Sequence, residues 1–329
     1  MSDKTKISWA QATVNWARGC QKVSDGCKSC YAIGQVAGLA RKMGGVNPEA
    51  AAKFEGLVKD GNWTGVVRID EKAMTQPLRW QKGRRIFVNS LGDTFHDSIS
   101  DLDLLRFFEV VRQARRHTFL VLTKRPERMK SFCERLRFDS GDGRERRGGL
   151  WLVGGPYPEG TQQLPGEDQL RGFSNGGGRY GFTMVMKNLW LGVTAENQAT
   201  ADERIPLLVQ TPAAVRFLSC EPLLSAIDLS KWLVTSPPEE KSSTREGWPF
   251  SGASQDPKGP LSWIIAGGES GSRFRPMDLD WARSLRDQCV ASGTAYFFKQ
   301  SSATKPGQGD TLDGVAWRQF PDDGQRRGE

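Results

Sequence analysis

Three cysteines near the N-terminus, Cys20, Cys27 and Cys30, are the residues of this sequence best suited to chemistry. They lie within eleven residues, so one short loop can direct three soft thiolates to a single point. A closed structural zinc site normally takes four protein ligands, whereas three thiolates suit a metal centre that keeps one position for a substrate or cofactor. We therefore predict a metal site with one open coordination position.

The spacing of the cysteines and the residues beside them favour a metal-binding loop. Cys27 and Cys30 stand at positions i and i+3, where a tight turn points both sulfur atoms inward. Gly19 and Gly26 precede two of the cysteines and allow the close backbone approach that wrapping a metal requires. Three buried free thiols are the alternative, but cysteines clustered between glycines are rare in core elements.

A zinc site is the competing interpretation, because two residues could supply a fourth ligand. His96 and Asp93 both follow a predicted strand, and either could reach the cysteine loop. The only other histidine, His117, stands at the start of a strand and is expected at the opposite end of the fold. Against zinc, a chain of 329 residues can bury a large core and needs no metal for stability.

Short apolar runs, each followed by a helical pattern, predict an α/β fold with a parallel sheet. Eight such units are the count of a closed (β/α)8 barrel, whose active site lies at the carboxyl ends of the strands. We therefore predict a TIM-like (β/α)8 barrel, complete or partial and irregular. The predicted strands are 12–16, 65–69, 85–90, 118–123, 189–194, 215–220, 262–267 and 294–299, and the predicted helices are about 31–43, 71–81, 101–116, 125–137, 197–209, 222–233 and 278–291.

Polar and ionisable residues recur where the predicted strands end. Each one alone could cap a helix or meet solvent, but their recurrence predicts a shared site at one end of the sheet. The candidate catalytic residues are Asp93, His96, Glu221, Glu269 and Lys299, and the candidates for lining a cofactor pocket are Asn89, Ser90, Thr123 and Glu196. Positive charge at the rim would come from Lys124, Arg125, Arg128 and Lys299, with a helix-surface pair of Lys124 and Glu127 as the alternative.

The domain organisation is predicted to be one barrel domain over residues 1–305, followed by a C-terminal tail over 306–329. Two long glycine-rich or polar stretches, at about 138–187 and 234–260, interrupt the alternation and are predicted to be loop insertions.

Composition and charge narrow the class of protein. Hydrophobic residues make up 37% and charged residues 26% of the chain, which is typical of a globular protein. No apolar run is long enough to span a membrane and no signal peptide is evident, so we predict a cytoplasmic protein with reduced cysteines. The net charge of +8 could attract nucleic acid, although solubility alone explains such an excess equally well.

Several long motifs resemble those of the phage-type three-Cys-motif proteins, a poorly characterised group found in bacteria and their phages. The resemblance covers nearly the whole chain except the two insertions and the tail. The motifs that carry it are 16–32, with the three cysteines, and then 86–96, 118–128, 190–194, 201–206, 217–224, 266–271, 275–277 and 297–300.

That family is in turn similar to the radical S-adenosylmethionine (SAM) enzymes. The similarity implies that Cys20, Cys27 and Cys30 hold three irons of a [4Fe–4S] cluster and that SAM chelates the fourth. An external electron donor would then drive SAM cleavage to a 5′-deoxyadenosyl radical, which abstracts hydrogen from an unknown substrate; nucleic acid is one candidate. Tyr31 matches the aromatic residue that commonly packs beside the adenine.

Two features depart from the radical SAM pattern. Six residues, not three, separate the first two cysteines, and the only Gly-Gly-Glu lies at 267–269, after the seventh predicted strand. We therefore assign no SAM-binding role to Glu269. The alternative function is a non-catalytic zinc or iron–sulfur protein that binds nucleic acid or a protein partner.

Overall fold

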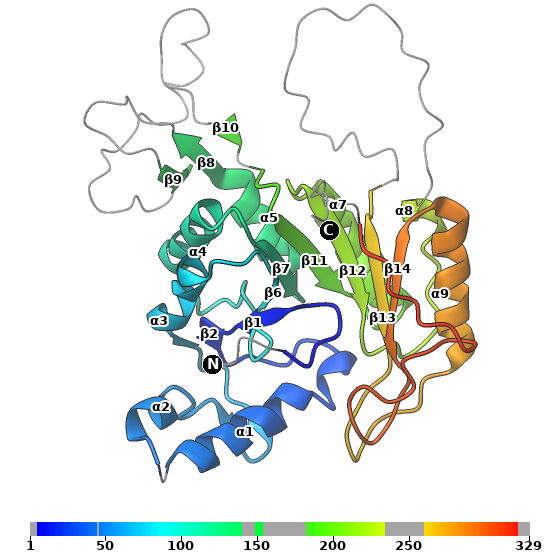
Figure 1. Ribbon diagram of the computed structural model, residues 1–329, viewed down its shortest axis with the longest axis horizontal. Helices are drawn as coiled ribbons and strands as arrows, with labels where there is room; N and C mark the ends of the chain where they lie inside the picture. The colour runs from blue at the N-terminus through cyan, green and yellow to red at the C-terminus, as the bar shows by residue number, and fades with distance from the viewer. Residues whose placement is uncertain are drawn as a thin grey trace, which may run out of the picture.

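A seven-stranded parallel sheet forms the centre of the computed structural model, which describes residues 5–44, 46–139, 149–153, 182–183, 185–233 and 260–321 (Figure 1). The strand order follows the chain, so each strand pairs with the next one that enters the sheet. The strands are β1 (Ala12–Val14), β6 (Arg85–Val88), β7 (Thr118–Thr123), β11 (Leu189–Thr194), β12 (Val215–Cys220), β13 (Trp263–Gly267) and β14 (Ala295–Gln300).

Crossover helices cover one face of this sheet. They are α4 (Asp101–Gln113), α5 (Pro126–Arg135), α7 (Gln198–Gln210) and α9 (Leu279–Ser292). Their buried side chains join those of the strands in one large cluster, here called the outer core. Since these four helices all lie on the same face, the sheet curls away from them into a half-barrel, as Figure 1 shows.

The opposite, concave face of the sheet carries a second cluster, here called the inner core. Alternate residues of each strand point to opposite faces, so Ile86 and Val88 enter the outer core while Phe87 enters the inner core. Gly192 leaves room on the concave face, because a Cβ there would lie 2.6 Å from the Phe217 ring. The inner core consists of Trp9, Phe87, Leu120, Trp190, Phe217, Trp263, Ile265 and Phe297.

The prediction of a closed eight-stranded barrel is wrong. The described sheet has seven strands and two edges, β1 and β14, which do not pair with each other. The missing strand is the one predicted at 65–69, of which only β5 (Arg68–Ile69) is extended, and it pairs antiparallel with β2 (Ala17–Arg18). The direct pairing of β1 with β6, in the register Ala12↔Ile86, leaves no place for a strand between them.

The helix predicted at 222–233 is also wrong, because only α8 (Ser230–Leu233) is helical there. Leu223, Ile227 and Leu229 are buried in the outer core from non-helical backbone, so their spacing imitates a helical pattern. The helix predicted at 71–81 is divided into α3 (Glu71–Met74) and the 3₁₀ helix η2 (Gln76–Arg79).

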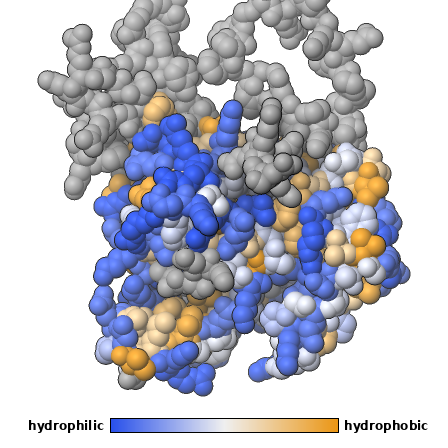
Figure 2. All heavy atoms as spheres, in the orientation of Figure 1, coloured by the Kyte–Doolittle hydropathy of each residue, from blue (hydrophilic) through white to orange (hydrophobic). Residues whose placement is uncertain are grey.

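A small N-terminal subregion lies at the carboxyl end of the sheet and appears in blue in Figure 1. It contains η1 (Asp25–Cys27), α1 (Tyr31–Gly44), α2 (Pro48–Ala52) and the hairpin of β3 (Val58–Lys59) and β4 (Asn62–Trp63). Its own apolar cluster joins Val36 of α1 to Leu91, which follows β6. Figure 2 shows apolar side chains at the surface over α1 and α2, within a largely hydrophilic face.

The two predicted insertions lie largely outside the described residues. The described part of the first insertion forms an antiparallel sheet in the order β10-β8-β9, from β8 (Leu136–Asp139), β9 (Gly149–Leu152) and β10 (Phe182–Thr183).

The segment predicted as a C-terminal tail packs against β14. The Phe298 N–H donates to the Trp317 carbonyl at 3.0 Å, and the Gln319 N–H donates to the Tyr296 carbonyl at 3.1 Å. Phe320 then packs on Trp263, with 5.2 Å between ring centroids, so this segment extends the inner core. Within the described ranges, no helix has the length and apolar character to cross a membrane.

Truncation of Trp263 should strongly destabilise the protein, because this buried side chain contacts the Trp9, Trp190 and Phe217 rings of the inner core. We expect Trp263→Ala to lower the free energy of unfolding by about 3–5 kcal/mol, measured by urea denaturation. The control Val290→Ala, at an exposed position of α9, should change it by less than about 0.5 kcal/mol. Equal losses in the two variants would contradict the central place of the inner core.

Candidate functional site

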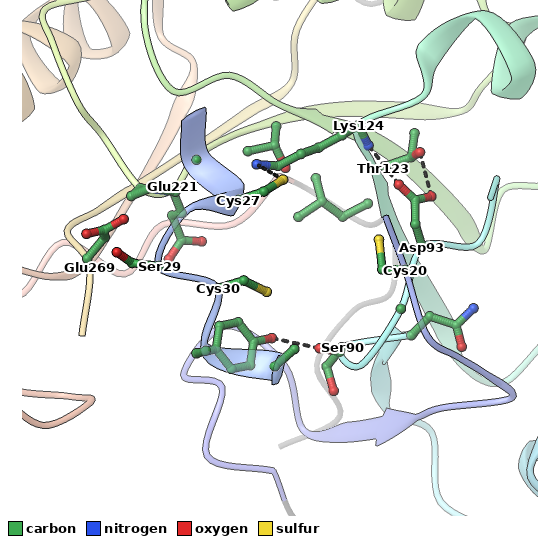
Figure 3. A pocket seen from close by; sticks show the side chains of 18 of the residues that line it. Cys20, Cys27, Ser29, Cys30, Ser90, Asp93, Thr123, Lys124, Glu221 and Glu269 are labelled. Carbon is green, nitrogen blue, oxygen red and sulfur yellow. Dashed lines mark hydrogen bonds between the residues drawn. The ribbon is translucent and has the colours of Figure 1, made fainter. Parts of the chain in front are cut away.

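The three predicted metal ligands line one pocket at the carboxyl end of the parallel sheet (Figure 3). The inner-core residue Phe87 and the adjoining Leu122 form part of its floor, and polar residues that follow the strands form its walls. Every other candidate site residue except His96 and Glu196 lines the same pocket: Tyr31, Asn89, Ser90, Asp93, Thr123, Glu221, Glu269 and Lys299.

The cysteine side chains approach the pocket from one loop. Cys20 follows β2, Cys27 ends η1 and Cys30 precedes α1, and Figure 3 shows the three sulfur atoms around a common space. Across the described ranges, no group of three or more His, Cys, Asp or Glu side chains is arranged to hold a single metal ion. Four ligands at 2.3 Å from one zinc would place sulfur atoms about 3.8 Å apart, whereas thiolates on separate irons of a cluster are spaced more widely.

Glu196 does not line the pocket, but its carboxylate holds the cysteine loop in place. Its buried carboxylate accepts hydrogen bonds from Ser24 Oγ at 2.6 Å, from Arg204 Nη1 at 3.3 Å, and from Lys124 Nζ. Burial opposes ionisation of Glu196, but the Lys124 and Arg204 charges outweigh it and lower the pKa of this carboxyl. Gly26 fits directly against the carboxylate, and a Cβ at that position would overlap it.

The Asp93 carboxylate accepts four hydrogen bonds, three of them from residues at the end of β7. Its Oδ1 accepts from Thr123 Oγ1 at 2.7 Å and from the Phe95 N–H at 2.9 Å. Its Oδ2 accepts from the Lys124 N–H at 3.1 Å and from Arg125 Nη1 at 3.0 Å. A carboxylate with four donors cannot bind a metal without losing some of these bonds, so Asp93 is a poor fourth ligand.

Two cationic side chains approach the thiols. Lys124 Nζ lies 3.6 Å from Cys27 Sγ, and Arg125 Nη1 lies 4.0 Å from Cys20 Sγ. Burial opposes ionisation of Cys27, but the Lys124 charge and hydrogen bonds from the loop lower the pKa of this thiol. Burial and the Asp93 carboxylate raise the pKa of Cys20 to about 12, against the opposing effect of Arg125.

Paired charges form the opposite wall of the pocket. Lys299 Nζ lies 2.7 Å from Glu221 Oε1, and Ser219 Oγ donates to Glu221 Oε2 at 3.1 Å. Glu269 is paired with Arg275, whose backbone N–H donates to Oε2 at 2.8 Å and whose Nε lies 3.1 Å from both carboxylate oxygens. Arg275 Nη2 also donates to the Asp25 carbonyl at 3.0 Å, so this arginine ties the cysteine loop to the turn after β13.

The wall beside Cys30 is held by Tyr31 and Asn89. The Tyr31 hydroxyl donates to the Ser90 carbonyl at 3.0 Å. The Asn89 side chain accepts from the Ala17 N–H at 3.0 Å and donates to Thr94 Oγ1 at 3.0 Å, from a left-handed backbone with φ of 57°. Asn89 therefore fixes the path of the chain where β6 ends, besides lining the pocket.

The two histidines lie away from the pocket lining. His96 is buried, and its Nδ1 accepts from the Ser98 N–H at 3.1 Å. Burial and the nearby Arg125 lower the pKa of His96. His117 lies 3.0 Å from the Pro77 carbonyl through Nε2, at the amino end of β7 as predicted. The placement of His96 therefore does not support a zinc site in which this histidine is the fourth ligand.

The remaining three cysteines are free thiols buried in the outer core. This confirms the interpretation of Cys220 as a packed apolar residue, although it ends a strand beside the pocket. Cys133 and Cys289 lie in α5 and α9.

Three residues that hold the site, Ser24, Arg204 and Arg275, are absent from the sequence-based candidates. All three fall inside motifs that carry the family resemblance, which is the only signal that could have found them. Their roles depend on contacts between residues that are distant in sequence, such as the Arg275 side chain and the Asp25 carbonyl, so no local pattern reveals them.

Comparison with known proteins identifies the family of the chain. A family model described as a protein of unknown function, DUF5131, matches residues 4–321, and the chain belongs to that family. Searches of curated proteins and of solved structures returned no match. The family description names no activity, so the three-Cys and radical SAM resemblance stays a prediction.

Substitution of Gly26 should disturb the seat of the cysteine loop, because an added methyl group overlaps the Glu196 carboxylate. We expect Gly26→Ala to cost about 1–3 kcal/mol of unfolding free energy and to speed alkylation of Cys27 by iodoacetamide. Urea denaturation and mass spectrometry of the modified peptide measure the two effects. The control Gly34→Ala in α1 meets no atom within 4 Å and should neither destabilise the chain nor change the alkylation rate. Identical behaviour of the two variants would refute the anchoring role of Glu196.

Proposed function

We propose that the chain is an iron–sulfur enzyme of the radical SAM type, which uses a [4Fe–4S] cluster and SAM to act on an unknown substrate. One observation carries this proposal. Three thiols from a single loop line one pocket at the carboxyl end of a parallel sheet, while Asp93 is engaged by four donors and His96 lies elsewhere. A trio of thiols without a fourth protein ligand suits a centre that binds a further molecule.

Cys20, Cys27 and Cys30 would hold the cluster. When bound, the cluster and SAM would supply one-electron chemistry that removes a hydrogen atom from the substrate. The chain itself contributes position and charge. Ser24 and Arg275 hold the cysteine loop in place, and Phe87 of the aromatic inner core forms part of the pocket floor.

The opposite wall would orient a polar ligand. The side chains of Glu221 and Lys299 are 14% and 25% exposed, so this ion pair faces the pocket and remains accessible. Their opposite charges can bind a group that carries both an ammonium and a carboxylate, with Ser219 supporting Glu221. Tyr31, Asn89, Ser90 and Thr123 would form the adjoining cofactor wall.

The pocket has a volume of about 220 Å³, which is far too small to admit a nucleic-acid duplex. Nucleic acid therefore remains a candidate substrate only if one nucleotide leaves the stack, as enzymes that modify bases require. The described residues hold one clustered set of cysteines, so an external electron donor is part of the proposal. We also propose a cytoplasmic location, where free thiols such as these six stay reduced.

Loss of a single loop cysteine should abolish cluster loading without unfolding the sheet. The anaerobically reconstituted wild-type chain should contain about four iron and four sulfide ions and should convert SAM to 5′-deoxyadenosine in the presence of dithionite. We expect Cys27→Ala and Cys30→Ala to lose the iron, the brown colour and SAM cleavage while they keep the wild-type circular dichroism. The control Cys133→Ala, in the outer core, should load iron normally.

Different outcomes separate the alternatives. A colourless wild-type protein with one zinc, or an iron-loaded protein that never cleaves SAM, would replace the proposal by a non-catalytic metal protein that binds nucleic acid or a protein partner. Loss of the fold in the metal-free chain would identify a structural metal.

A further inference from the structure

Two consecutive residues after β7 reach two different cysteines. Lys124 Nζ lies 3.6 Å from Cys27 Sγ, and Arg125 Nη1 lies 4.0 Å from Cys20 Sγ. Figure 3 shows the Lys124 side chain extending to Cys27 across the top of the pocket, with Asp93 and Cys20 on the same side. Positive charge is therefore placed beside two of the three thiols by one short segment of the chain.

This segment is fixed at both its backbone and its side chains. Asp93 Oδ2 accepts from the Lys124 N–H and from Arg125 Nη1, while Thr123 Oγ1 accepts from the Arg125 N–H at 2.9 Å. Glu196 and Ser24 hold the Lys124 ammonium. The alternative pairing of Lys124 with Glu127 on the surface of α5 does not describe this placement, because the ammonium points inward to Glu196.

The cations nearest the thiols are paired with carboxylates but differ in how closely they are neutralised. Lys124 and Arg204 share Glu196, whereas Arg125 pairs with Asp93 at 3.0 Å and with the exposed Asp97 at 3.9 Å. The Lys124 and Arg125 side chains are 18% and 8% exposed, so solvent screens them only in part. Arg125 Nη2 is buried and has no hydrogen-bond partner in the described ranges, which leaves one donor for an anion.

We propose that Lys124 and Arg125 form a cationic clamp that sets the reduction potential of a metal centre held by the loop cysteines. This inference rests on the proposed function. Adding an electron makes a thiolate-bound cluster more negative, and nearby positive charge and donors to the sulfur atoms favour that step. Lys124 and Arg125 are thus positioning residues that act through the sulfur ligands and need not touch the substrate.

Redox titration of the reconstituted protein, followed by electron paramagnetic resonance, tests the clamp. Lys124→Met removes the cation and leaves the Glu196 carboxylate beside Cys27. At a fixed solution potential we expect the ratio of reduced to oxidised cluster to fall about tenfold, equivalent to a midpoint about 59 mV more negative for one electron.

Three matched variants separate charge from structure. The double variant Lys124→Met/Glu196→Gln removes one charge of each sign and should restore the ratio to within about twofold of wild type, as should Lys124→Arg, which keeps the charge. Lys28→Met removes a lysine of the same loop whose side chain is 66% exposed, and should change the ratio less than about twofold.

The outcomes also distinguish the clamp from the proposed function. A wild-type chain that loads no iron–sulfur cluster defeats both. A loaded cluster with the same midpoint in wild type and Lys124→Met defeats the clamp alone, and so does an equal fall in Lys124→Met and Lys124→Arg, which would make geometry the cause. Iron and sulfide analysis of each variant ensures that equally loaded proteins are compared.

Discussion

The buried Glu196 carboxylate is the interaction on which the rest of the site depends. It joins Ser24 of the cysteine loop, Lys124 after β7 and Arg204 of α7, which are distant in sequence. A buried carboxylate is costly unless its oxygens are paired, so removal of one partner leaves charge uncompensated. The position of the loop is therefore coupled to the end of the sheet, and Gly26 is the residue whose small size allows this contact.

The curled sheet explains why the pocket combines an apolar floor with polar walls. Alternate strand residues face inward, so the sequence of β12 places Phe217 in the inner core and then Ser219 and Glu221 toward the pocket. The same period places Phe297 below Lys299 on β14. One side of each strand thus supplies both the packing that supports the pocket and the charges that line it.

Local sequence patterns predict much of this arrangement. The rest depends on contacts between residues that are distant in sequence. Seven of the eight predicted strands enter the sheet in chain order, because alternating apolar residues and capped helices such as α7, with its Asn197–Thr200 capping box, are local signals. The run at 65–69 has the composition of a strand, but it does not enter the parallel sheet because β1 pairs directly with β6. His96 and Glu196 both follow strands and are predicted from the sequence to lie in the site with Thr123. Unlike Thr123 they do not line the pocket, because their side chains point elsewhere, and the sequence does not reveal that direction.

The inner core draws its outermost residues from opposite ends of the described chain. Trp9 packs on Trp263 from the N-terminal side, while Phe320 covers the same ring and Gln319 accepts a hydrogen bond from its indole N–H at 3.0 Å. The contact between Trp9 and Trp263 closes about 250 residues of intervening chain, so its loop-closure entropy is lost only when the whole sheet is assembled. During synthesis on the ribosome the aromatic floor consequently stays open until the last strand and the segment after it have emerged, and chaperone protection of that surface matters most in this interval.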